Sequence, residues 1–150
     1  MTSEHAPRDR PRRSLRTRGV THYVLHTVAD ARGALSFAQV GDPLPFAPQR
    51  YFILHDIPSG AVRGEHAHKT LQQFLVCVHG TCTVKVDDGR VKDEITLSGP
   101  GEGLFIEPFV WTTVVHHARE TAVLVLASEV YLEDDYIRSY PEFLETVGAS

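Results

Sequence analysis

The stretch LQQFLVCVHGTCTVKVDDGRVKDEITL, residues 71–97, determines the fold class of this chain. It contains three short runs rich in Val, Leu, Phe and Thr, separated by turn-forming residues and not by helices. Asp88-Gly89 between the second and third runs is typical of a type I′ hairpin, whose central positions require residues that tolerate positive φ. Short strands joined by tight turns predict antiparallel pairing and exclude a parallel α/β sheet.

The same pattern continues in both directions from this stretch. Six more runs predict strands: THYVLHTV (21–28), ALSFAQ (34–39), RYFILHD (50–56), GLFIE (103–107), VWTTVVHH (110–117) and TAVLVLAS (121–128). We therefore predict an all-β fold, an antiparallel sandwich or barrel. One short helix is expected near the C-terminus, capped by Asp134 or Asp135 and open to a break at Pro141. Its apolar stripe would comprise Tyr136, Ile137, Tyr140, Phe143 and Leu144.

Length and charge limit the domain organisation and the partners. A chain of 150 residues predicts one domain, which we assign to residues 20–150. Residues 1–19, rich in Arg, Pro and Ser, are expected to form a disordered tail, because they show no periodic apolar pattern. The net charge of −4 argues against nucleic acid as the main partner.

No apolar run reaches the length of a membrane span, and the N-terminal residues lack the apolar segment of a secretory signal. A cytoplasmic protein without membrane contact is therefore expected. In that reducing compartment we favour two free thiols over a disulfide for Cys77 and Cys82, which a tight turn at His79-Gly80 would place opposite each other.

The densest chemistry lies in RGEHAHK, residues 63–69. Residues two apart on a strand point to the same side, so His66 and His68 should project together while Ala67 faces away. Two imidazoles in one cavity are either metal ligands or an acid/base pair. Two partly exposed histidines near a strand end are the alternative.

The spacing of these residues resembles the first motif of the cupins, which form jelly-roll barrels. The matching positions are Gly60, His66, His68, Gln73 and Gly80, with Gln73 standing where metal-binding cupins carry Glu. The second motif would place a histidine near Thr112 and Thr113, and none is there. A catalytic metal needs about three good protein ligands, so we favour a histidine site with no metal or other cofactor.

Within the cupins the chain resembles the nucleotide-sugar 3,4-ketoisomerases. Four stretches carry the resemblance: Asp30–Gly33, Arg63–Lys69, Leu75–Gly89 and Leu126–Tyr140, the last with the pattern ASxxYxxxDYIRxY. The resemblance implies conversion of dTDP-4-keto-6-deoxyglucose to its 3-keto isomer, as a step of deoxysugar biosynthesis. By analogy, His66 would be the base at carbon 3 and His68 its partner, although the sequence alone does not order them.

A binding site for a nucleotide sugar requires cations and hydrogen-bonding groups. Arg50 and Arg63 are expected to hold the diphosphate, with Lys69 either a third cation or solvated. Gln73 would hydrogen-bond the substrate, and Trp111 would either stack on thymine or the sugar or pack in the core.

Related enzymes tend to carry a pocket tyrosine on the strand at residues 50–56, but the register here directs Phe52 inward and Tyr51 outward. Either the register slips by one residue or this chain lacks that hydroxyl, and the sequence leaves both alternatives open. Two rival functions remain open: a metal-dependent cupin such as a dioxygenase or epimerase, and a sugar-nucleotide-binding cupin without catalysis. The family precedent also implies a homodimer, with exchange of the strand at residues 21–28 between subunits.

Overall fold

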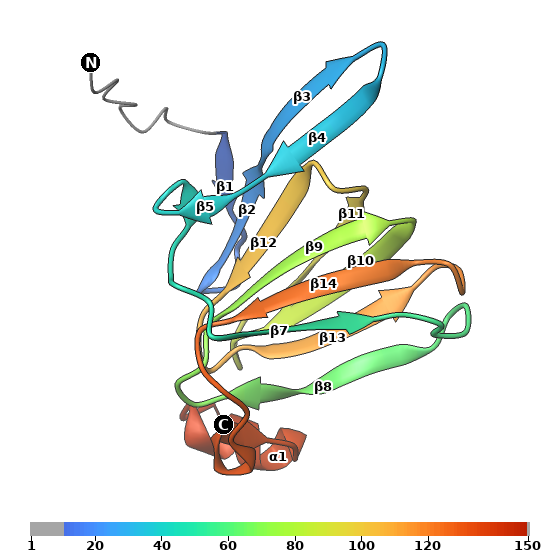
Figure 1. Cartoon of the computed structure of the whole chain (residues 1–150). Helices are drawn as coiled ribbons and strands as arrows, with labels where there is room; N and C mark the ends of the chain where they lie inside the picture. Colours follow the sequence, from blue (N-terminus) through green and yellow to red (C-terminus); the bar gives the residue numbers. More distant parts are fainter. Residues whose placement is uncertain (1–10, 150) are drawn as a thin grey trace, which may run out of the picture.

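The computed structural model describes residues 11–149 and consists mainly of two antiparallel sheets (Figure 1). The first sheet has six strands in the order β1 (Arg12–Ser14), β2 (Val20–Val24), β12 (Glu102–Ile106), β9 (Gln73–His79), β14 (Ala122–Ala127) and β7 (Arg50–Leu54). The second has five strands in the order β11 (Lys92–Ser98), β10 (Thr81–Asp87), β13 (Trp111–His116), β8 (Val62–His68) and β15 (Tyr136–Ile137).

Smaller elements lie outside these sheets. They are the hairpin β3 (His26–Asp30) and β4 (Gly33–Phe37), the short pair β5 (Gln39–Val40) and β6 (Pro43–Leu44), a 3₁₀ turn η1 (Glu133–Asp135), and helix α1 (Tyr140–Thr146). The predicted all-β fold with a short C-terminal helix is confirmed. No helix among residues 11–149 is long and apolar enough to cross a membrane.

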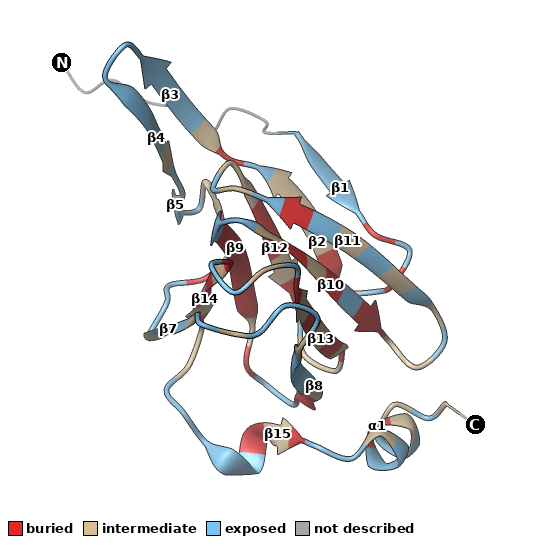
Figure 2. Ribbon diagram, turned by 90° about the vertical axis from the view of Figure 1, so that its right-hand side faces the viewer, coloured by how far each residue is buried: buried red, intermediate tan, exposed pale blue. Residues whose placement is uncertain are grey.

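The main core lies between the two sheets. Alternate residues of β9 and β14 point inward, among them Leu75, Cys77 and Val125, and meet residues of β10 and β13 such as Val84 and Val114. Buried residues accordingly gather along β9, β10 and β12, while β1 and the β3–β4 hairpin are exposed (Figure 2).

Two predicted turns form differently from expectation. The hairpin at Asp88-Gly89 exists, but Asp87 pairs with Lys92, so the loop has four residues and only Gly89 takes a positive φ (92°). The Asp88 side chain stabilises this loop by accepting hydrogen bonds from the backbone N–H groups of Arg90 and Val91.

The turn at His79-Gly80 does not join a hairpin, because β9 and β10 belong to different sheets. The chain crosses there from one sheet to the other. Gly80 takes a positive φ (75°) at this crossing and lies against Thr121. Cys77 and Cys82 are both buried free thiols, as expected.

The segment 11–19 corrects the expected extent of the tail. Leu15 and Thr17 are buried, and β1 pairs with β2. Backbone N–H groups of Arg16 and Arg18 donate to the carboxylates of Asp93 and Asp88. These acidic partners on a distant hairpin order an Arg-rich segment that has no apolar periodicity of its own. The rest of the expected tail, residues 1–10, lies outside the described residues.

The C-terminal helix starts later than predicted. Ser139 caps it by accepting from the backbone N–H of Glu142, and Pro141 fits in the first turn, where its missing N–H needs no partner. Asp134 and Asp135 lie in the preceding 3₁₀ turn and do not cap α1. The residues expected to share one helical stripe are therefore divided between β15 and α1.

Candidate active site

A cavity of about 450 Å³ opens at the inner face of β8. The lining residues come from both sheets and from the segment after β14: Phe52, Leu54, Val62, Arg63, Gly64, Glu65, His66, Gln73, Thr112, Val114, Val125, Tyr136 and Arg138. Of the predicted site residues, the structure thus brings together Arg63, His66 and Gln73. Phe52 lines the cavity and Tyr51 is exposed, as the register predicted.

A β-bulge sets the direction of the histidine pair. On β13, Thr113 pairs with Gly64 and Thr112 with His66, so Glu65 is the extra residue. Gly64 (φ 90°) and Glu65 (φ 58°) both take left-handed conformations there. A Cβ on Gly64 would stand 2.7 Å from the carbonyl oxygen of Thr112, so glycine is required at this position.

His66 and His68 lie side by side on the inner face, as predicted. Their ring centroids are 4.9 Å apart at 90°, while Ala67 faces the opposite side and packs with Phe143 of α1. Tyr136 closes the group, with its ring centroid 4.9 Å from that of His66 and 4.5 Å from that of His68. The pairing of β15 with β8, in which Tyr136 lies opposite His68, holds this ring in place.

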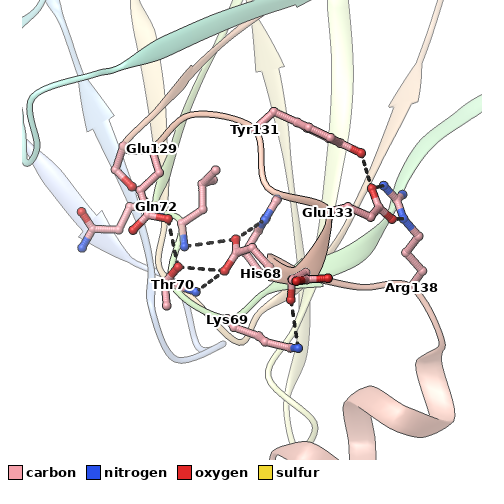
Figure 3. Close-up of polar contacts among 12 residues, drawn as sticks. His68, Lys69, Thr70, Gln72, Glu129, Tyr131, Glu133 and Arg138 are labelled. Carbon is pink, nitrogen blue, oxygen red and sulfur yellow. Dashed lines mark hydrogen bonds and ion pairs between the residues drawn. The ribbon is translucent and has the colours of Figure 1, made fainter.

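His68 is tied to a buried carboxylate. Its Nδ1 lies 2.9 Å from Oδ2 of Asp135, and hydrogen bonds from Thr70 reach the other oxygen of the same carboxylate (Figure 3). Burial opposes ionisation of Asp135, but the hydrogen bonds from Thr70 and His68 outweigh it and keep its pKa below the usual value. His66 has no such partner, and its buried Nδ1 makes no hydrogen bond.

Both imidazoles are neutral near pH 7. Burial lowers the pKa of His66. Burial, together with the neighbouring His66, also lowers the pKa of His68 to about 4, although Asp135 opposes this shift. Each ring therefore carries one lone pair that can accept a proton.

Cations surround this neutral pair. The guanidinium of Arg50 lies 5.4 Å from the ring centroids of both Phe52 and Tyr131, and its buried Nε and Nη2 have no hydrogen-bond partner. Arg63 lines the cavity and is exposed. Buried guanidinium nitrogens without a partner can bind an anion through charge-assisted hydrogen bonds.

Arg138, in contrast, is already paired. It donates from Nε and Nη2 to the two carboxylate oxygens of Glu133, and its guanidinium lies 4.3 Å from the ring centroid of Tyr136. Tyr131 donates its hydroxyl to the same carboxylate (Figure 3). From this segment, Tyr136 and Arg138 line the cavity, and the ion pair with Glu133 holds Arg138 in place.

Two predicted site residues lie elsewhere. Lys69 is exposed and donates from Nζ to the carbonyl oxygen of Asp134, outside the cavity lining. Trp111 points to the outer face of its sheet, where it packs against Tyr140 and Phe143 of α1. Lys69 lies outside the cavity because it follows the last residue of β8. Trp111 points outward because it precedes the inward Thr112 on β13.

His116 is an inward histidine at the other end of β13. It is fully buried, and neither ring nitrogen has a hydrogen-bond partner. His117 faces outward and contacts Thr83, so only one of the two histidines points inward. Residues 11–149 contain no group of three His, Cys, Asp or Glu side chains placed to hold a metal ion.

Sequence reasoning missed Asp135, Tyr136 and Arg138 as site residues. The signal was present, because all three fall in the DYIR pattern that carried the family resemblance. The sequence places Asp135 and Tyr136 at the start of the expected helix. The pairing of β15 with β8 instead sets Tyr136 opposite His68.

The pKa of His68 predicts a pH dependence of stability. The unfolded chain protonates this histidine below about pH 6.5 and the folded chain only near pH 4, so stability falls as the pH is lowered through this window. The free energy of unfolding should therefore fall between pH 7 and pH 4.5 in the wild type. In His68→Asn this fall should be smaller by about 2 kcal/mol. Urea unfolding at both pH values measures this difference. The exposed His79→Asn serves as the control, and an equal loss in all three proteins would contradict the assignment.

Comparisons with known proteins cover most of the chain. A family model described as "FdtA: WxcM-like, C-terminal" matches residues 18–148. The TDP-4-oxo-6-deoxy-alpha-D-glucose-3,4-oxoisomerase of Aneurinibacillus thermoaerophilus is 40% identical over 121 residues, which are 81% of this chain and 87% of that protein.

Solved structures agree with this match. A 3,4-ketoisomerase from Helicobacter canadensis has a TM-score of 0.82 and 35% identity, covering 86% of this chain and 97% of the other. A sugar 3,4-ketoisomerase from Thermoanaerobacterium thermosaccharolyticum, solved with TDP, has a TM-score of 0.84 and 30% identity, covering 87% and 96%. A histidine-to-asparagine mutant of the latter enzyme was solved with TDP-4-keto-6-deoxyglucose. The cupin-like fold and the predicted family are thereby confirmed: the chain belongs to the FdtA family of sugar 3,4-ketoisomerases.

Proposed function

We propose that this chain converts dTDP-4-keto-6-deoxyglucose to a dTDP-3-keto-6-deoxyhexose by histidine acid/base catalysis. The observation that carries the proposal is the pair of neutral imidazoles 4.9 Å apart, one lining a cavity of about 450 Å³ and the other tied to a carboxylate. The relatives that act on TDP-linked 4-keto sugars support the substrate class.

The reaction needs proton transfers and no oxidant. The C3–H bond breaks, its electron pair forms the C3=C4 bond of an enediol(ate), and the former carbonyl electrons move to the oxygen on carbon 4. The proton of the hydroxyl on carbon 3 leaves as its oxygen becomes a carbonyl, the oxygen on carbon 4 gains a proton, and carbon 4 takes a proton. Each transfer needs a group that is neutral near pH 7 and can take or give a proton.

The two histidines divide these transfers in the proposal. His66 lines the cavity, which suits a base at carbon 3, and His68 moves the hydroxyl proton between the two oxygens. Gln73, which also lines the cavity, donates a hydrogen bond to a sugar oxygen. The cationic surroundings of Arg50 and Arg63 favour the negative charge of the enediolate. The proposal uses no metal or other cofactor.

The test is turnover in deuterated water with EDTA present. The chain should convert dTDP-4-keto-6-deoxyglucose to the 3-keto isomer and incorporate deuterium at carbon 4, and NMR of the product also gives the configuration there. A metal-dependent cupin would lose turnover on chelation and regain it with one specific metal. A binding protein without catalysis would bind the nucleotide sugar but leave its carbon 3 proton unexchanged. Either result would contradict the proposal.

The diphosphate seat is proposed at Arg63 and Arg50. A charge-assisted hydrogen bond is worth about 1.5–3 kcal/mol, so Arg63→Ala should weaken dTDP binding by roughly 10- to 100-fold. Isothermal titration calorimetry with dTDP measures this change. Arg90→Ala removes the same charge in the exposed loop between β10 and β11, away from the cavity lining, and should leave the affinity unchanged. Equal affinities of both variants for dTDP would remove Arg63 from the site.

A homodimer is part of the proposal. The β3–β4 hairpin projects from the two sheets and exposes Val28 and Leu35, whose relative exposures are 61% and 60% (Figure 1). Burial of such side chains in a subunit interface would remove their unfavourable contact with water.

Two further expectations stay predictions: the exchange of residues 21–28 between subunits, and a cytoplasmic location. Sedimentation equilibrium should give twice the chain mass of 16.7 kDa, and a monomer would contradict the dimer.

A further inference from the structure

We propose that Asp135 is a positioning residue of the reaction, which holds His68 as the Nδ1–H tautomer and so keeps the lone pair on Nε2. The inference rests on the proposed function for its catalytic consequence. The tautomer itself is a property of the folded chain and can be tested without substrate.

The geometry permits only one arrangement of the proton. Oδ2 of Asp135 lies 2.9 Å from Nδ1 of His68, and the two side chains are 7% and 4% exposed. The same carboxylate also accepts from the backbone N–H of Thr70, from the Thr70 hydroxyl and from the backbone N–H of Leu71. A carboxylate that receives donors on both oxygens stays ionised and can only accept, so Nδ1 must carry the proton.

The backbone fixes this contact from both sides. Asp135 ends the turn η1 directly before β15, and its carbonyl oxygen accepts from the backbone N–H of Lys69. The next residue, Tyr136, pairs with His68 and packs its ring against that of the histidine. The imidazole is therefore held by a hydrogen bond from Nδ1 and by an edge-to-face contact with the Tyr136 ring, so a ring flip would have to break both contacts.

The tautomer of His68 decides whether this ring can accept the proton of the sugar hydroxyl on carbon 3. When His68 accepts it on Nε2, the ring becomes an imidazolium whose charge is stabilised by the adjacent carboxylate of Asp135. Asp135 itself keeps its ionised form throughout. In the opposite tautomer, Nε2 would carry a proton and could not accept one, and Nδ1 would face the carboxylate with its lone pair. His66, which has no carboxylate partner, cannot be held in this way.

The test combines NMR of the intact protein with kinetics. In the 15N-labelled wild type near pH 7, His68 should show a protonated Nδ1 and an unprotonated Nε2, with His68→Asn used to assign the signals. Asp135→Asn, whose amide can donate to Nδ1, should lose this preference and lower kcat by roughly 10- to 10³-fold. Its dTDP affinity should stay within about twofold, because the proposed nucleotide seat lies on other residues.

Thr70→Val is the matched control. It removes the hydroxyl that donates to the same carboxylate but leaves the contact between Asp135 and His68. It should keep the Nδ1–H tautomer and a near wild-type kcat.

A wild type with the proton on Nε2 of His68 would overturn the inference even if Asp135→Asn fails to fold. A folded Asp135→Asn with kcat within twofold of the wild type would also overturn it. An inactive wild type that shows the Nδ1–H tautomer would contradict the proposed function and leave the tautomer assignment standing.

Discussion

The buried contact between Asp135 and His68 joins the parts on which the site depends. It ties the segment after β14 to the end of β8, and its second oxygen holds the turn that leads from β8 to β9. A buried carboxylate is costly unless several donors satisfy it, and here the side chains and backbone of three other residues do so. Tyr136, the next residue after Asp135, pairs with His68 and lines the cavity.

The site combines neutral imidazoles in and beside the cavity with an arginine that is not paired to any carboxylate. Burial keeps His66 and His68 unprotonated near neutral pH, and Arg50 offers two hydrogen-bonding nitrogens that the chain itself leaves unpaired. A purely structural role would favour pairing of these groups, as happens between Arg138 and Glu133 at the cavity wall. Of the unpaired groups, His66 lines the cavity and Arg50 stacks on Phe52 of its lining, where a TDP-linked keto sugar would supply partners, whereas His116 is buried at the other end of β13.

Much of this arrangement could be predicted from local sequence patterns. Alternation of apolar residues predicted the strands and the common direction of His66 and His68, because a strand fixes side-chain direction within two residues. Whether Phe52 or Tyr51 faces the cavity stayed open in the sequence, and the structure has Phe52 there. Gln73 was likewise placed correctly on the inward face of β9.

The failures concern contacts between distant segments. The order of residues 11–19 depends on acidic partners about 70 positions away. The roles of Asp135 and Tyr136 depend on a two-residue strand that no periodicity signals. For Trp111 the sequence left open stacking on the substrate or packing in the core. Its position in the alternation, next to the inward Thr112, directs it to the outer face, where it packs against Phe143 of α1.

The central claim is that the imidazoles perform the proton transfers, and exchange of the carbon 3 proton with solvent by His66→Asn tests it most directly. Asparagine keeps the approximate size and hydrogen bonding of the side chain but has no basic nitrogen. The account predicts a folded variant that binds dTDP with wild-type affinity and exchanges this proton about 10²- to 10⁴-fold more slowly. A variant that folds, binds dTDP and exchanges the proton at the wild-type rate would contradict it.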